Sequence, residues 1–223
     1  MARYERIPAP KETPQPQILI VPGLNNSGPR HWQTHWESEL PGASKVELGC
    51  WDNPDRNLWV NRLNLAIHKA AAPVILVAHS LGCHAAAWWA EYEQPPRLGG
   101  KVAGALLVAP PDVESADIDP RLKRFGPLIQ GRLPFRSLLV ASTDDPHAAM
   151  GQSKRMARKW GSQLIDAGPL GHINADSGIA NWPYGKYLLR QLIRTVDAAI
   201  ETFASDLIAA HQQRWEQSVM ALR

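Results

Sequence analysis

The sequence predicts an α/β protein in which helices cover both faces of a mostly parallel sheet of about six strands. The first indication is a series of short runs that are apolar throughout, at residues 18–23, 74–80, 102–111 and 137–143, with weaker runs at 45–48 and 162–168. Strands that are apolar on both faces are typical of a parallel sheet covered on both sides. The second indication is the helical pattern between these runs, at residues 29–40, 55–71, 82–93, 147–160 and 183–220. This alternation favours a doubly wound, three-layer arrangement.

The first and last helices carry the clearest signals of their own. The first is predicted to begin with Pro29 at its first helical position, where the missing N–H costs nothing. The last has apolar residues at a spacing of three or four, which predicts one packed face. The pattern continues past the expected end of the domain, through Leu189, Leu192, Val196, Ile200, Phe203, Leu207, Ile208, Trp215 and Val219. We expect this end of the helix to cover the domain or to pair with a second chain in a homodimer.

The chain is predicted to form one domain at residues 17–200, between a flexible arm at 1–16 and a helical extension at 201–223. The arm is polar and proline-rich and lacks the apolar core of a signal peptide. The segment at 110–136 interrupts the alternation of strands and helices, since it is too long and too rich in proline for a simple crossover. Both a lid over a site and an irregular connection with one helical turn fit this segment.

The composition makes several partners unexpected. The net charge is +3 and the basic residues are scattered, so a nucleic-acid partner is not expected. No stretch approaches a membrane-spanning helix in length, and two cysteines do not make a disulfide framework, which indicates a reducing, cytoplasmic compartment. His31 and His35 have the spacing of helical metal ligands, but no Glu or Cys partners them at metal spacing. We therefore expect neither a metal nor a cofactor.

A serine stands where the predicted strand at 74–78 meets the following helix, in the sequence Ala78-His79-Ser80-Leu81-Gly82. This is a G-x-S-x-G nucleophile elbow with alanine at the first glycine position. A sharp turn at this place exposes the hydroxyl above the carboxyl edge of the sheet, and the close strand and helix demand small residues on both sides. The alternative is an ordinary N-cap serine, which explains the hydroxyl but not the small neighbours.

An acid and a histidine follow Ser80 in the order that this kind of site requires. Asp144 and Asp145 come directly after the strand at 137–142, and His172 is in the glycine-rich loop after the last strand. Adjacent side chains point in different directions, so only one of the two aspartates can serve the histidine. Asp145 is favoured, because the proline that follows it holds its backbone extended. Asp144 is then expected to cap the turn.

Backbone amides near Ser80 are candidates for stabilising an oxyanion. The N–H of Leu81 lies at the start of the helix after the elbow. A second amide is expected from the loop after the first strand, from Leu24 or Asn25, since a shift of one residue is left open. Asn25, Trp32 and Trp51 are candidate walls of the substrate pocket, and the tryptophans fit a core position equally well.

Four motifs together resemble a known family. "PGLNNSGPRHWQTHWE", "AHSLGC", "STDDP" and "GHINADSG" are similar to those of the small α/β-hydrolases named after a retinoblastoma-binding protein, over about residues 17–195. The resemblance implies an α/β-hydrolase fold with little or no cap domain, weak esterase-like activity, and Ser80, Asp145 and His172 as nucleophile, acid and base. The motif said to bind the retinoblastoma protein is not matched, so that partner is not carried over.

The function predicted from these residues is a serine hydrolase that cleaves a small ester, thioester or amide through an acyl-enzyme. The expected partner is a small acyl substrate, and the fold does not choose between acyl groups. The alternative is an α/β-hydrolase-fold binding or scaffold protein without turnover. A nucleotide-binding protein is disfavoured, because "GLNNSG" is only a faint phosphate loop and the Ser-Asp-His order would go unexplained.

Overall fold

Six parallel strands form one sheet in the order β2–β1–β3–β4–β5–β6, which confirms the predicted fold class. The computed structural model describes residues 15–97 and 99–220. Its strands are β1 (Gln17–Val21), β2 (Ala43–Lys45), β3 (Val74–His79), β4 (Val102–Val108), β5 (Arg136–Ala141) and β6 (Gln163–Asp166). The expected arm at 1–16 lies almost entirely outside the described residues.

The second strand, β2, begins two residues before the apolar run at 45–48 that predicted it and ends at Lys45. Val46 and Leu48 are buried, but they follow β2 rather than form it. The pairing between β1 and β2 ends at Ile20 and Lys45. The N–H of Val46 makes one more hydrogen bond to β1, to the carbonyl of Ile20 at 2.8 Å. Since β1 ends at Val21, the strand does not continue, and Val46 and Leu48 pack their side chains into the core.

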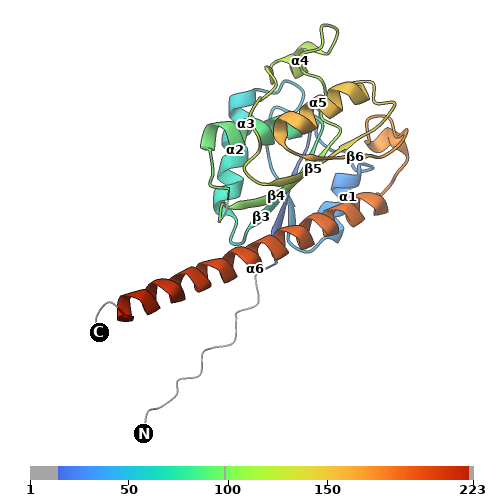
Figure 1. The fold of residues 1–223 in the computed structure, drawn as a ribbon. Helices are drawn as coiled ribbons and strands as arrows, with labels where there is room; N and C mark the ends of the chain where they lie inside the picture. Colours follow the sequence, from blue (N-terminus) through green and yellow to red (C-terminus); the bar gives the residue numbers. More distant parts are fainter. Residues whose placement is uncertain (1–14, 98, 221–223) are drawn as a thin grey trace.

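Helices cover the two faces of the sheet (Figure 1). The helical elements are α1 (Trp32–Glu39), α2 (Arg56–Lys69), α3 (Leu81–Glu93), α4 (Pro120–Lys123), α5 (Met150–Trp160), the short 3-10 helix η1 (Ala175–Ser177) and α6 (Pro183–Met220). Helices α2, α3 and α5 share one hydrophobic core with one side of the strands, and α1 and α6 share a second core with the other. Neighbouring strand residues alternate between the two cores, as Leu76 and Val77 do, because side chains in a strand alternate between faces.

The first helix begins three residues later than predicted. Pro29 belongs to the preceding turn, and His31 is the N-cap of α1. The His31 Nδ1 accepts a hydrogen bond from the N–H of Gln33 at 3.1 Å. A side-chain acceptor thus satisfies one of the free amides at the helix start, where the proline signal had placed a helical residue.

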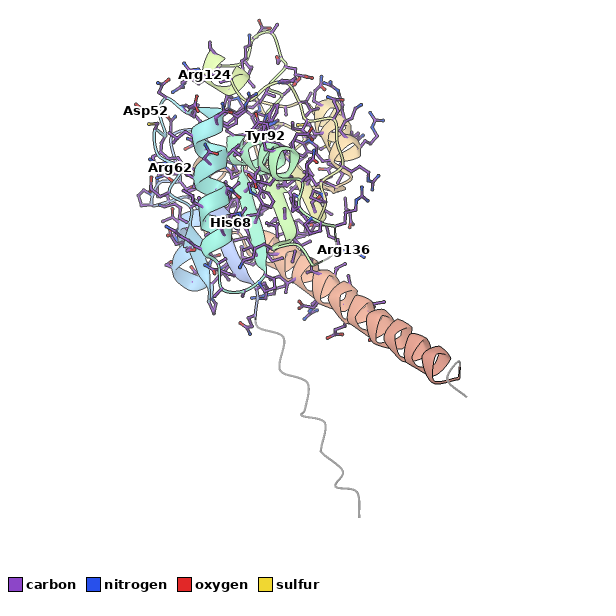
Figure 2. All side chains as sticks on the ribbon, turned by 90° about the vertical axis from the view of Figure 1, so that its left-hand side faces the viewer. Asp52, Arg62, His68, Tyr92, Arg124 and Arg136 are labelled. Atoms are coloured by element: carbon purple, nitrogen blue, oxygen red, sulfur yellow. The ribbon has the colours of Figure 1, made fainter. Side chains whose placement is uncertain are left out.

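The irregular segment at 110–136 contains the single helical turn α4 and packs against the domain. Its apolar side chains Leu122, Phe125 and Leu128 are buried in the first core. The Arg124 guanidinium donates to the Asn53 side chain at 2.7 Å, and Figure 2 shows Arg124 and Asp52 at the same end of the molecule. The segment is therefore a packed connection in this structure, and movement as a lid remains a prediction.

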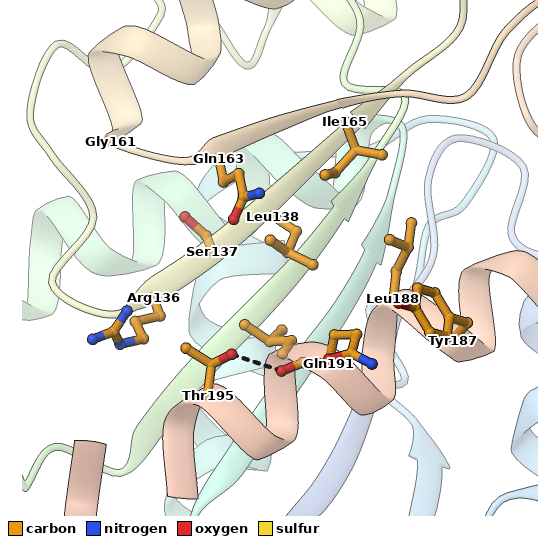
Figure 3. Close-up of a pocket in the computed structure, with 11 residues that line it drawn as sticks. Arg136, Ser137, Leu138, Gly161, Gln163, Ile165, Tyr187, Leu188, Gln191 and Thr195 are labelled. Atoms are coloured by element: carbon orange, nitrogen blue, oxygen red, sulfur yellow. Dashed lines mark hydrogen bonds between the residues drawn. The ribbon is translucent and has the colours of Figure 1, made fainter. Parts of the chain in front are cut away.

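Helix α6 crosses the face of β4 and β5 and continues as one helix through residue 200, so the expected boundary there is not a break in secondary structure. Figure 1 shows its second half leaving the domain. Beside α6, a groove of about 360 Å³ runs along β5 and β6 between Leu138, Ile165 and Tyr187 (Figure 3). Within the described residues, no helix has the length and apolar content needed to cross a membrane.

Candidate active site

The backbone at Ser80 is strained. Its φ of 53° and ψ of −125° lie where residues other than glycine are rarely found. Its N–H donates to the carbonyl of Val108 in β4 at 2.8 Å, which helps to hold the turn. Ser80 occupies the N-cap position of α3, but its hydroxyl makes no capping bond. The N-cap alternative is therefore wrong for the hydroxyl, which points elsewhere.

Small residues around the turn let β1, β3 and α3 approach closely. A Cβ added at Gly82 would lie 2.4 Å from the carbonyl oxygen of Val21, at the end of β1. A Cβ at Gly23 would lie 2.8 Å from the Cβ of Ser80. Ala78 is fully buried in the first core. These contacts give the physical reason for the small residues of the elbow.

His172 brings Ser80 and Asp145 into one chain of hydrogen bonds. The His172 Nε2 lies 2.8 Å from the Ser80 Oγ, and its Nδ1 lies 3.0 Å from each carboxylate oxygen of Asp145. Because an ionised carboxylate can only accept, the imidazole proton is on Nδ1 and the serine hydroxyl donates to Nε2. The Asp145 side chain is only 3% exposed. The loops after β3, β5 and β6 thus place the three predicted residues together.

The two adjacent aspartates have different contacts. Asp145 accepts the N–H of His147 at 2.9 Å in addition to the His172 ring. Asp144 makes no contact with that ring; one of its oxygens accepts from the Ser142 hydroxyl and from the N–H of Gly171, both at 2.7 Å. These two donors, the hydroxyl first, lower the pKa of Asp144. Asp144 therefore ties the turn after β5 to the histidine loop, whereas the sequence predicted that it caps its own turn. The N–H of His147 in that turn is accepted by Asp145 instead.

The candidate amides differ in whether they are free. The N–H of Leu81 is the first of α3 and has no acceptor within the helix. In the loop after β1, the N–H of Asn25 donates to the carbonyl of Trp51 at 2.8 Å. The N–H of Leu24 makes no hydrogen bond with any residue that the structure describes. Leu24 and Asn25 both line the cavity beside Ser80.

The two tryptophans do not line that cavity. Trp32 is fully buried in the second core, where its Nε1 donates to the carbonyl of Ile173 at 2.8 Å. Trp51 is half-buried and packs edge-on against Trp59. The expectation of pocket walls is therefore wrong for both. Trp32 instead holds the loop that carries His172, because its indole N–H reaches a partner from within the core.

Three further histidines lie around His172. From the sequence only His31 was considered, as a possible metal ligand, and no role in this site was predicted for any of them. Their rings form a chain in which His31 lies 4.8 Å from His79, and His79 and His147 lie 5.0 and 4.5 Å from His172, between centroids. The His79 Nε2 lies 2.9 Å from the His172 carbonyl, so it carries the proton and donates. Burial lowers the pKa of His31 to about 4 and lowers those of His79 and His147. Only position pointed to them: His79 precedes the nucleophile, and His147 follows the Asp145-Pro146 pair.

A cavity of about 410 Å³ opens over Ser80 and His172. Residues at the ends of β1, β3, β5 and β6 and in the segment at 110–136 line it. Besides Ser80 and His172 they are Leu24, Asn25, Asn26, Gly28, His31, His79, Asp119, Arg121, Leu122, His147, Asn174 and Ala175. A larger cavity of about 630 Å³ lies elsewhere, beside Arg136 at the opposite end of β5, and contains none of these residues. Figure 2 shows Arg136 near α6, far from Asp52. Size alone does not mark the site; the nucleophile and histidine do.

The profile of the serine hydrolase family matches residues 18–191. The chain belongs to the serine hydrolase family. A YdeN-like hydrolase from Pectobacterium atrosepticum is 32% identical, the match covers 82% of this chain and 92% of that one, and the structures superpose with a TM-score of 0.70. The chain is therefore related to bacterial hydrolases. The narrower family name implied by the motifs remains a prediction.

Two other proteins extend the comparison. YdeN of Bacillus subtilis strain 168, which is named as a hydrolase, is 26% identical over 180 residues, 75% of this chain and 90% of its own length. The crystal structure of that gene product covers 80% of this chain and 99% of its own, with a TM-score of 0.65 and 23% identity. An α/β hydrolase from a metagenome of lagoon sediments in Morocco covers 82% of this chain and 92% of its own, with a TM-score of 0.61 and 13% identity. The last two likenesses support the α/β-hydrolase fold.

Proposed function

We propose that this serine hydrolase cleaves a small ester, thioester or amide through an acyl-enzyme on Ser80. The observation that carries the proposal is the hydrogen-bonded chain from the Ser80 hydroxyl through His172 to Asp145, at 2.8 and 3.0 Å. A serine hydroxyl is a poor nucleophile by itself, and an adjacent base oriented by a third group activates it.

In the proposed reaction, the Ser80 Oγ attacks the substrate carbonyl carbon while its proton passes to the His172 Nε2. Asp145 accepts from the Nδ1–H and stabilises the imidazolium. The leaving group departs with the proton from Nε2, and the acyl group stays on Ser80. A water molecule then attacks the acyl carbonyl, gives its proton to Nε2, and releases the acid as Ser80 regains that proton.

The amides of Leu81 and Leu24 are the proposed donors to the oxyanion. Both lack an acceptor in the described residues; Leu81 directly follows the nucleophile, and Leu24 lines the same cavity. Asn25 is disfavoured, because its N–H donates to Trp51 and using it would break that bond. Aligned amide donors that are free before the reaction stabilise developing charge without reorganisation.

A fluorophosphonate probe tests the proposal. We expect one adduct, on Ser80, which the Ser80→Ala variant abolishes while its circular dichroism stays unchanged. Ser38→Ala, at an exposed serine of α1, is the matched control and should label like the wild type. A panel of chromogenic esters and thioesters then identifies the acyl group. A folded protein that never labels at Ser80 would favour the alternative, a binding or scaffold protein without turnover.

The proposed setting is the cytoplasm. Cys50 and Cys83 are both free thiols, and Cys83 is buried in the first core. Free thiols suit a reducing compartment. The proposed partner is a small acyl substrate, with no nucleic acid.

A further inference from the structure

The cavity over Ser80 is unusually polar for a small-molecule pocket. Pockets of this size are mostly lined by apolar and aromatic side chains, with a few polar groups. Here Asn25, Asn26 and His31 come from one loop and Asn174 from another. The apolar lining is limited to two leucines and two small residues, Leu24, Leu122, Gly28 and Ala175. A plain alkyl chain bound here would remove water from these polar groups and give them no new partner. The lining favours a ligand with its own hydrogen-bonding atoms.

His31 supplies a side-chain donor that has no partner among the described residues. The residue is only 5% exposed, and it lines the cavity. The Nδ1 accepts from the N–H of Gln33, so the proton of the neutral ring is on Nε2. Burial, the first cause, and the nearby His172 lower the pKa of His31 to about 4, so the ring is neutral at pH 7. The Nε2–H makes no hydrogen bond with any residue of the described chain, and a bound molecule can supply the missing acceptor.

The charged pair beside the cavity indicates that this acceptor is uncharged. The Arg121 guanidinium donates to the Asp119 carboxylate through Nε and Nη2, at 3.1 and 2.6 Å, and its Nη1 donates to the carbonyl of Asp52 at 3.1 Å. Each charge is therefore already neutralised by the other. A phosphate or carboxylate on the ligand would have to compete with Asp119 for the arginine. An ether, hydroxyl or carbonyl oxygen faces no such competition.

We propose that His31 determines specificity by donating its Nε2–H to an uncharged oxygen of the substrate other than the scissile carbonyl. The preferred substrates are then short esters or thioesters that carry a hydroxyl, ether or carbonyl oxygen, rather than plain alkyl esters. This inference rests on the proposed function of Ser80. It adds a residue from α1's N-cap to the substrate site.

The variants must separate the two roles of His31, which caps α1 through Nδ1 and is proposed to bind the substrate through Nε2. His31→Asn keeps a side-chain oxygen that accepts from Gln33, because Asn is a favoured N-cap residue, and it withdraws the Nε2–H from the cavity. His31→Ser is a second capping variant in case the first is poorly folded. His35→Asn is the matched control, since His35 is one turn further along α1 and does not line the cavity.

The probes are two pairs of p-nitrophenyl phosphonates, and the readout is the rate of Ser80 phosphonylation, followed by mass spectrometry. In one pair the chain on phosphorus is propyl or methoxymethyl, and in the other the alkoxy chain is butoxy or 2-methoxyethoxy. Each rate is divided by the rate at which hydroxide attacks the same phosphonate, which corrects for the intrinsic reactivity of the probe. We expect the wild type and His35→Asn to prefer the oxygen-bearing member of at least one pair by roughly five- to tenfold, the scale of one neutral hydrogen bond.

Both His31 variants should reduce that preference to within about twofold, and the pair that responds tells which part of the substrate carries the oxygen. Equal rates within both pairs for a wild type that labels at Ser80 would overturn this inference and leave the proposed function standing. A preference that survives in folded His31→Asn would also overturn it. No phosphonylation of Ser80 by any probe would overturn the proposed function, and this inference with it.

Discussion

Replacement of Asp145 by asparagine is expected to abolish most turnover while the fold survives. In the wild type both carboxylate oxygens accept from the His172 Nδ1–H at 3.0 Å. Asparagine can keep one oxygen on the N–H of His147, which leaves its NH2 group facing the imidazole. His172 then favours the tautomer with its proton on Nε2, which cannot accept from Ser80. Loss of such an orienter costs roughly three to four orders of magnitude in kcat, or about 4 to 5.5 kcal/mol in the barrier.

Asp144→Asn is the matched control for this prediction. Its retained oxygen can still accept from Ser142 and Gly171, and it does not touch the His172 ring. We expect kcat within a few-fold of the wild type and a modest fall in melting temperature. The assay is kcat on the best ester of the chromogenic panel, with melting temperatures for both variants. An inactive Asp144→Asn beside a normally active Asp145→Asn would show that the assignment is wrong by one residue.

Three further predictions follow from the packing. His84 is buried and donates from Nε2 to the Pro111 carbonyl, and burial lowers its pKa to about 4. Because the unfolded pKa is about 6.5, the unfolded state binds the proton first, and the fold loses stability as the pH falls through this window. When the pH is lowered from 7 to 4.5, the free energy of unfolding, measured in urea, should therefore fall by about 2 to 3 kcal/mol less in His84→Gln than in the wild type. Equal losses would contradict this account. Gly82→Ala should destabilise by about 1 to 3 kcal/mol, because its Cβ would meet the Val21 carbonyl at 2.4 Å; an unchanged melting temperature would disprove the close approach. If helix α6 pairs two chains beyond Ile200, truncation there should halve the mass in light scattering, and an unchanged mass would refute the homodimer.

The sheet and the order of the candidate site residues could be read from the sequence because each depends on local pattern. A strand that is apolar on both faces is visible as a run, and Ser80, Asp145 and His172 each follow such a run. The start of α1 was misplaced because Pro29 is a local signal for helix entry, whereas the side chain of His31 decides where the amides are capped. Such a choice depends on one hydrogen bond, which no periodicity reports.

The surroundings of the site could not be predicted in the same way. Trp32 looked equally suited to a pocket and to a core, and only the contact of its indole N–H with Ile173, 141 positions away, decides between them. The same holds for Asn25, whose N–H is engaged by Trp51 from a different loop. Arg121 reached the cavity through an irregular segment with no regular pattern. Long-range contacts made by loops leave little trace in one sequence.

Catalysis by Ser80, His172 and Asp145 also requires that the histidines beside His172 stay uncharged. For Ser80 to lose its proton, His172 must become positively charged while His79 and His147 lie 5.0 and 4.5 Å from its ring. A positive charge on either neighbour would oppose that step by about 3 kcal/mol, from Coulomb's law at 5 Å and an effective dielectric constant near 20. Burial lowers the pKa of both neighbours, well below its usual range for His79, which favours their neutral forms and reduces this cost. The rings of Trp32 and His31, which pack against His79, therefore contribute to the chemistry as well as to the fold, because they help to bury it.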